Sequence, residues 1–147
     1  MIDGRGTQLP ESGHDSPLSF AVMERDRDTV ALVKRALERR NVLLAYQPIV
    51  QASNPNRVAF YEGLIRIIDD TGCILPARDF IGAIEESETG RIIDCLALEM
   101  GLEALAETPS LRLAINMSAR SIGYPRWNRT LARGLEMDKT VAERLIL

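Results

Sequence analysis

The chain has 147 residues, enough for one domain, and it is 46% hydrophobic and 27% charged, as globular proteins usually are. Its net charge is -3 and its basic residues are spread along the chain. This argues against a nucleic-acid polymer as partner, because proteins that bind one concentrate basic charge on one face. No apolar stretch approaches the ~20 residues of a membrane span, and no signal peptide is visible. We expect a cytoplasmic protein with no membrane partner and with two reduced cysteines.

The only histidine is His14, which falls in a stretch rich in Gly, Pro, Ser and charge. We interpret residues 1–25 as a disordered tail or linker, and residues 26–147 as the folded part. The folded part then has no histidine, which excludes Ser-His-Asp catalysis, Cys-His catalysis and histidine-rich metal sites. Any metal must be held by oxygen atoms, which favours Mg²⁺, Mn²⁺ or Ca²⁺.

Apolar spacing predicts helices and strands that alternate along the folded part. In chain order the predicted elements are a helix over 26–40, strands over 42–50 and 58–68, helices over 76–87 and 91–107, a strand over 111–118, a helix over 125–137 and a strand over 144–147. Asp26 or Asp28 is expected to cap the first helix, and Gly90 to separate the second from the third. Asn54-Pro55-Asn56 is turn chemistry that allows a hairpin. The alternation indicates an α/β fold with a largely parallel sheet.

Two charged residues interrupt the strand over 58–68. Side chains alternate along a strand, so Glu62, Leu64 and Arg66 project to one side. Glu62 and Arg66 are about 13 Å apart on an extended strand, too far for an ion pair, but a larger ligand could contact both. Partial exposure on an edge strand explains Glu62 equally well.

Two amides raise the same question. Asn116, near the end of its strand, and Gln47 could each supply a hard oxygen ligand. Spacing alone favours a buried amide bonded to the backbone. Taken together, Gln47, Glu62 and Asn116 favour a ligand-binding role over a structural one, because three strands each carry a carboxylate or carboxamide near the C-terminal end. Ligands bind at that end in parallel α/β folds.

Four segments carry a resemblance to a known family: Tyr46-Gln47-Pro48-Ile49-Val50, Glu62-Gly63-Leu64-Ile65-Arg66, Pro76-Ala77-Arg78-Asp79-Phe80-Ile81 and Asn116-Met117-Ser118-Ala119-Arg120-Ser121. In order and spacing, across residues 41–147, they resemble the EAL-domain family. That family comprises cyclic-di-GMP phosphodiesterases with a TIM-like (β/α) barrel.

The resemblance implies a role for each matched residue. Glu62 and Asn116 would be catalytic residues and metal ligands, and Gln47, Leu64 and Arg66 would bind the cyclic dinucleotide. Two Mg²⁺ or Mn²⁺ ions would activate a water that attacks one phosphodiester, giving linear pGpG. The guanidinium of Arg66 would orient the phosphate.

The chain departs from the family in two ways. Gly63 stands where the family has alanine, from which we expect a loosening of ~0.5–1 kcal/mol and no loss of metal ligation. The segment 144–147 resembles the stretch just before the family's next metal-binding glutamate. We therefore expect a truncated half-barrel, the N-terminal portion of an EAL domain, which lacks several metal ligands.

Three functional hypotheses follow. The first is a phosphodiesterase of bacterial second-messenger signalling, whose 147-residue chain is inactive alone. The second is a non-catalytic module that binds cyclic-di-GMP or a protein partner. The third, a small α/β domain with purely structural polar residues, is disfavoured by the four matched segments. Open sheet edges in a half-barrel predict a homo-oligomer.

Overall fold

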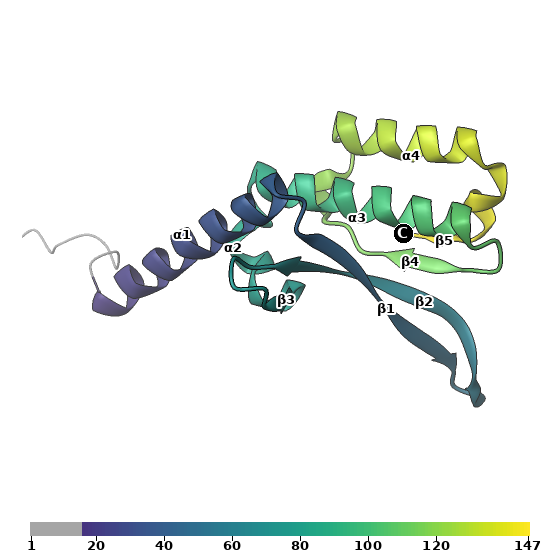
Figure 1. The fold of residues 1–147 in the computed structure, drawn as a ribbon, viewed down its shortest axis with the longest axis horizontal. Helices are drawn as coiled ribbons and strands as arrows, with labels where there is room; N and C mark the ends of the chain where they lie inside the picture. The colour runs from purple at the N-terminus through teal and green to yellow at the C-terminus, as the bar shows by residue number, and fades with distance from the viewer. Residues whose placement is uncertain (1–15) are drawn as a thin grey trace, which may run out of the picture.

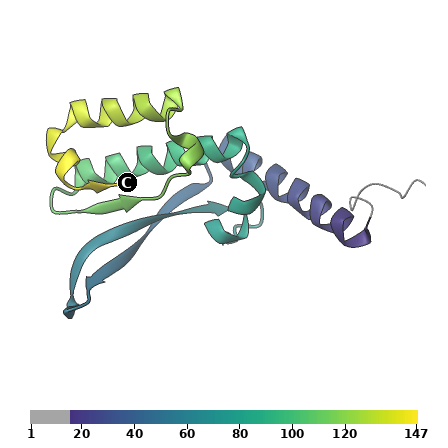
Figure 2. The same cartoon turned by 180° about the vertical axis from the view of Figure 1, so that it is seen from behind.

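The structure, a computed structural model, describes residues 16–147. It places a five-stranded sheet against a layer of helices, and the N-terminal part of α1 projects away from both (Figures 1 and 2). The C-terminal part of α1 is packed in the core through Val33 and Ala36. The elements are α1 (Pro17–Glu38), β1 (Val42–Gln51), β2 (Asn54–Ile68), β3 (Ile74–Pro76), η1 (Ala77–Asp79), α2 (Ile81–Ile84), α3 (Glu88–Glu107), β4 (Leu113–Ile115), η2 (Ala119–Ser121), α4 (Pro125–Met137), η3 (Lys139–Glu143) and β5 (Leu145–Ile146).

The strand order is β1-β2-β4-β5, and β3 pairs with β2. The pairs β2–β4 and β4–β5 are parallel, whereas β1 and β3 run antiparallel to β2. The predicted α/β class with a parallel ladder is confirmed, and so is the hairpin of β1 and β2. The turn of this hairpin lies at residues 52–53, so the prediction that residues 54–56 form it was wrong.

The first helix begins earlier than predicted. Ser16 is its N-cap, with the hydroxyl accepting a hydrogen bond from the Ser19 backbone at 3.1 Å, and Pro17 occupies the first turn. Residues 17–25 are therefore helical and not disordered. The capping serine followed by proline is a recognised start signal, which the polar composition of the segment obscured. The rest of the predicted tail, with His14, lies outside the described residues.

The helix predicted over 76–87 is instead two short elements, η1 and α2. Gly90 does not break a helix, because α3 starts at Glu88 and runs through it. A Cβ atom at Gly90 would lie 2.7 Å from the carbonyl oxygen of Ile84. Glycine at this position thus permits a close approach between the end of α2 and the start of α3. The later helix, α4, has the predicted bounds.

The core lies between the sheet and α3. Ile115 of β4 is 2% exposed, and its Cδ1 atom fills the space beside two glycines. A Cβ at Gly63 of β2, or at Gly101 of α3, would lie 2.7 Å from that atom. The loosening expected at Gly63 rests on the backbone freedom of glycine alone and stays a prediction. An alanine methyl at this position would also meet the far end of the Ile115 side chain, which would have to shift.

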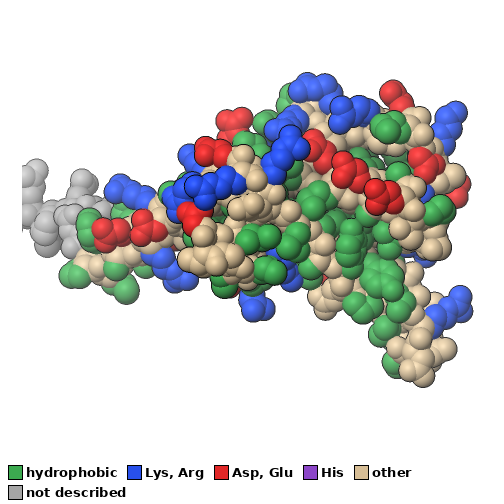
Figure 3. Space-filling model, viewed as in Figure 1, with side chains coloured by type: hydrophobic (Ala, Val, Ile, Leu, Met, Phe, Trp, Pro, Cys, Tyr) green, Lys and Arg blue, Asp and Glu red, His purple; other side chains and the backbone are tan. Residues whose placement is uncertain are grey.

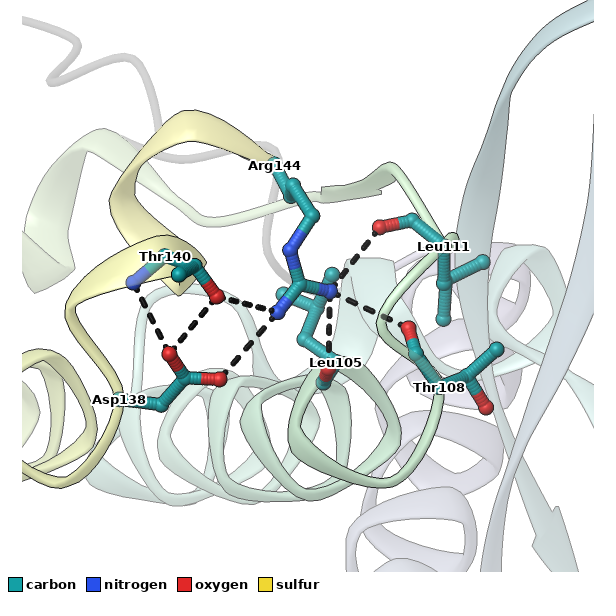
Figure 4. Close-up of polar contacts among 6 residues, drawn as sticks. All are labelled: Leu105, Thr108, Leu111, Asp138, Thr140 and Arg144. Atoms are coloured by element: carbon teal, nitrogen blue, oxygen red, sulfur yellow. Dashed lines mark hydrogen bonds and ion pairs between the residues drawn. The ribbon is translucent and has the colours of Figure 1, made fainter.

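Arg144 closes the N-terminal end of the parallel strands (Figure 4). Its side chain is 12% exposed. One guanidinium nitrogen, Nη1, donates to the carbonyl oxygens of Leu105, Thr108 and Leu111 at 2.8, 3.2 and 3.2 Å. These carbonyls belong to the end of α3 and to the connection that leads into β4. Arg144 itself immediately precedes β5, so it joins two loops at one end of the sheet.

The other nitrogen of Arg144, Nη2, faces the connection between α4 and η3. It donates to the Asp138 carboxylate at 3.3 Å and to the Thr140 hydroxyl at 3.0 Å (Figure 4). The pKa of Asp138 is lowered, chiefly by hydrogen bonds from the hydroxyl and the backbone of Thr140 and to a smaller extent by Arg144. Both guanidinium nitrogens are therefore engaged with protein acceptors.

The hairpin extends beyond the rest of the sheet. β4 pairs with β2 only from Tyr61 to Gly63, and residues 52–58 are exposed. Figure 3 shows hydrophobic side chains gathered over this hairpin. Three large apolar side chains of the hairpin are exposed: Tyr46 to 47%, Val50 to 45% and Val58 to 41%.

Candidate functional site

The predicted site residues of β1 and β2 share one face of the sheet. In β2, Gly63 is buried on the side of α3, so its neighbours Glu62 and Leu64 face the other way. The antiparallel register places Gln47 opposite Glu62. It also places Arg66 opposite Leu43, two steps further along the same face. All four predicted residues of the hairpin therefore lie on the face that α3 does not cover.

Asn116 joins this face from β4. The parallel pairing ends with Gly63 opposite Ile115, so the following residue lies beside the glutamate-bearing part of β2. The amide Nδ2 of Asn116 donates to Oε1 of Glu62 at 2.6 Å. The structure thus brings together two side chains that are 54 positions apart in the sequence. These are the two predicted metal ligands.

The structure also decides between the alternatives that spacing left open. β2 is a central strand between β1 and β4, so the edge-strand explanation of the half-buried Glu62 is wrong. Asn116 is exposed and bonds a carboxylate, so it is not a buried amide bonded to the backbone. Gln47 was predicted to reach the site from the C-terminal end of a parallel strand. Its strand β1 instead runs antiparallel to β2, and the hairpin register places Gln47 opposite Glu62.

Two of the predicted residues lie apart from the Glu62–Asn116 contact. The guanidinium of Arg66 donates to the backbone oxygen of Ile65 at 3.1 Å and forms no ion pair with Glu62, as the spacing predicted. Leu64 and Asn116 line a mainly apolar pocket of about 270 Å³ between β2, the loop after β4 and the first turns of α3. Gln47, Glu62 and Arg66 lie outside its lining.

One residue of this region was missed by sequence reasoning. Asp94 of α3 is 6% exposed and lines the same pocket. Its Oδ2 atom accepts hydrogen bonds from the backbone nitrogen of Ser118 at 2.9 Å and from the hydroxyl of Ser121 at 2.5 Å. A signal was present, since this aspartate interrupts the apolar run Ile92-Ile93-Asp94-Cys95-Leu96.

The donor set suits a hard divalent cation in kind. Glu62 and Asn116 offer carboxylate and amide oxygens, which Mg²⁺ and Mn²⁺ prefer. Their Oε2 and Oδ1 atoms accept no hydrogen bond from residues 16–147, so they are free to act as ligands. Over the same residues, no group of three or more His, Cys, Asp or Glu side chains is placed to hold a metal. The described residues therefore fit part of a metal site.

The fold and site define an α/β protein in which a carboxylate of β2 and an amide that directly follows the parallel strand β4 lie in contact. The EAL domain family model matches residues 31–147, and the chain belongs to this family. No protein with a curated description matches the chain.

Solved EAL structures share the fold. The FimX EAL domain of Xanthomonas citri, in complex with c-diGMP, is 22% identical with a TM-score of 0.70 over 86% of this chain and 50% of its own. The FimX EAL domain of Pseudomonas aeruginosa, bound to c-di-GMP, is 25% identical with a TM-score of 0.63 over 75% and 45%. The PaMucR phosphodiesterase, a c-di-GMP complex, is 21% identical with a TM-score of 0.61 over 80% and 49%.

The chain thus spans at most half the length of each of these three structures. In the part of the chain that the structure describes, none of the helices combines the length and hydropathy needed to cross a bilayer.

Proposed function

We propose that this chain forms the Glu62–Asn116 part of a cyclic-di-GMP phosphodiesterase site and works in bacterial, cytoplasmic second-messenger signalling. The observation that carries the proposal is the 2.6 Å contact between these two side chains. Glu62 lies in β2 and Asn116 directly follows β4, and both occupy positions where the EAL pattern has metal ligands. The c-di-GMP complexes of FimX and PaMucR support the choice of ligand.

In this proposal each residue has a definite task. Glu62 and Asn116 hold Mg²⁺ or Mn²⁺ through the carboxylate and the amide oxygen. When bound, such an ion lowers the pKa of a water and neutralises charge on the attacked phosphate. Arg66 lies on the same face and offers guanidinium protons to a phosphate. Gln47 and Leu64 contact the dinucleotide, the amide through hydrogen bonds and the leucine through apolar contact.

The number of metal-coordinating side chains decides whether the chain can hydrolyse cyclic-di-GMP or only bind it. A pair of catalytic divalent ions needs more donors than one carboxylate and one amide, and residues 16–147 supply no larger acidic cluster. The 147-residue chain is therefore expected to bind the dinucleotide and not to hydrolyse it. This favours, for the chain by itself, the second function considered above, a non-catalytic cyclic-di-GMP module.

The test is titration calorimetry of cyclic-di-GMP into the purified chain with Mn²⁺ present, together with chromatography of the nucleotide afterwards. Glu62→Gln should weaken binding of cyclic-di-GMP by about tenfold or more, because the carboxylate that holds Mn²⁺ in this proposal is lost. Glu103→Gln, on the exposed surface of α3, is the matched control and should bind normally. Equal affinities of Glu62→Gln and wild type would refute the site. Formation of pGpG by the chain alone would refute its inactivity.

The open edges of the sheet support a second copy of the chain as partner. β1 and β5 are the outer strands of the described sheet, and each presents backbone groups on its free side. Pairing of such edges between two chains would give a homo-oligomer. Sedimentation velocity should then show a dimer whose population rises with protein concentration, and a monomer at every concentration would exclude this partner.

A further inference from the structure

We propose that Asp94 is a positioning residue for Asn116. Its buried carboxylate holds the loop after β4 and thereby sets where the Asn116 amide meets Glu62. The inference rests on the proposed function for what the site binds. The positioning itself is a property of the ligand-free chain and can be measured there.

Asn116 lies just beyond the point where backbone hydrogen bonds to β2 end. The ladder between β2 and β4 ends at Ile115, so Asn116 is the first residue beyond it. Two residues later, the backbone nitrogen of Ser118 donates to Asp94 at 2.9 Å. Asn116 therefore lies between two fixed points, the end of the ladder and the carboxylate of α3.

The hydrogen bonds between Asp94 and this loop are strong ones. Both hydrogen bonds go to one oxygen of a carboxylate that is 6% exposed, and the second donor, Ser121, is fully buried. Hydrogen bonds to a charged acceptor are roughly twice as strong as neutral ones. No Lys or Arg among residues 16–147 forms an ion pair with Asp94. Its charge is instead balanced by donors from the loop.

Two other side-chain contacts of the same loop are exposed to solvent. Arg120 pairs with Glu86 at 2.9 Å, but these side chains are 54% and 77% exposed. The Tyr124 hydroxyl donates to Glu88 at 3.3 Å, also in an exposed place. Exposed ion pairs contribute little because water screens them. Asp94 is therefore the strongest of these three side-chain attachments of the loop.

The test uses NMR of the ligand-free chain. The readouts are the side-chain amide signals of Asn116, assigned by their loss in Asn116→Asp, and the exchange rate of the Ser118 backbone proton. In Asp94→Ala the amide signals should shift toward those of a solvated asparagine, and exchange at Ser118 should accelerate about tenfold or more. Asp94→Asn, which keeps an acceptor, should restore most of both. Glu86→Gln, which touches the same loop from solvent, should change neither.

Calorimetry with cyclic-di-GMP and Mn²⁺ gives the functional readout. Asp94→Ala should raise the dissociation constant about tenfold, with Asp94→Asn between it and wild type. Unchanged Asn116 signals in a folded Asp94→Ala protein would overturn the inference, whatever the affinity. If that variant does not fold, Ser121→Ala decides in the same way. Failure of the wild-type chain to bind would refute the proposed function, and the NMR result would still decide the role of Asp94.

Discussion

The two ends of β4 use polar side chains in opposite ways. At the N-terminal end, Arg144 is nearly buried and donates to three carbonyls, a carboxylate and a hydroxyl. At the C-terminal end, Asn116 is exposed, and its amide donates to a half-buried Glu62 whose second oxygen accepts nothing from the described residues. One end is satisfied by the protein itself, and the other keeps oxygens available for a ligand.

The proposed function would use this contrast to separate a stabilising end of β4 from a ligand-binding end. In barrels of this kind, conserved polar groups at the C-terminal ends of strands bind ligands, whereas those at the N-terminal ends stabilise the fold. Here the separation is set by hydrogen-bond satisfaction, because a fully bonded group resists removal and a partly bonded group can still take a ligand.

The largest effect on stability is expected from Arg144→Met. The change leaves three carbonyls and Asp138 without their guanidinium partner, so we expect the free energy of unfolding to fall by about 3 kcal/mol. Urea denaturation followed by circular dichroism measures it. Arg126→Met is the control, because Arg126 meets Glu99 only at 3.7 Å and is 44% exposed. Equal losses in the two variants would contradict the stabilising role of the N-terminal end.

A smaller effect is expected from Gly63→Ala, which restores the alanine of the EAL pattern. The added methyl meets Ile115, so we expect a loss of about 1 kcal/mol in the free energy of unfolding. Shortening the neighbour with Ile115→Val should make the same change less costly, giving a favourable coupling in a double-mutant cycle. Gly82→Ala, where a Cβ meets nothing within 4 Å, is the control and should not destabilise. Additive losses at Gly63 and Ile115 would show that they do not compete for space.

The smallest effect on stability is expected from Glu62→Gln. The new amide keeps an oxygen that can accept the proton of Asn116, so the free energy of unfolding should change by less than about 0.5 kcal/mol. Urea denaturation alongside Arg144→Met tests the comparison directly. A loss as large as that of Arg144→Met would mean that Glu62 supports the fold and is not reserved for a ligand.

Local patterns were enough to predict much of the fold. The hairpin, the parallel strands and the bounds of α4 all follow from apolar periodicity, although the hairpin turn lies at residues 52–53 and not at 54–56. The error at Gly90 occurred where a tertiary contact overrides a local rule, whereas the early start of α1 is a local capping signal that was missed. Gly90 looked like a helix breaker, but it is required by the close approach of Ile84. At Gly63 a methyl would also meet a tertiary neighbour, the far end of the Ile115 side chain at 2.7 Å.

The candidate site was predictable to the extent that strand direction determines it. Glu62 and Asn116 meet because β2 and β4 are parallel and in register, which a βαβ pattern implies. Gln47 reaches the same face through an antiparallel register that spacing alone did not reveal. Asp94 was missed because its partners, Ser118 and Ser121, are brought to it only by the packing of α3 on the sheet.

The turn of the β1–β2 hairpin is a suitable position for attaching a label. This tight turn at Ala52 and Ser53 is exposed and lies beyond the part of β2 that β4 pairs with. Exposed loop tips accept inserted sequence with little disturbance to the elements that they join. A fluorophore or an affinity tag placed between these two residues would be carried on a strand that leads directly to Gln47. Occupancy of the site could then be followed by an optical signal from outside it.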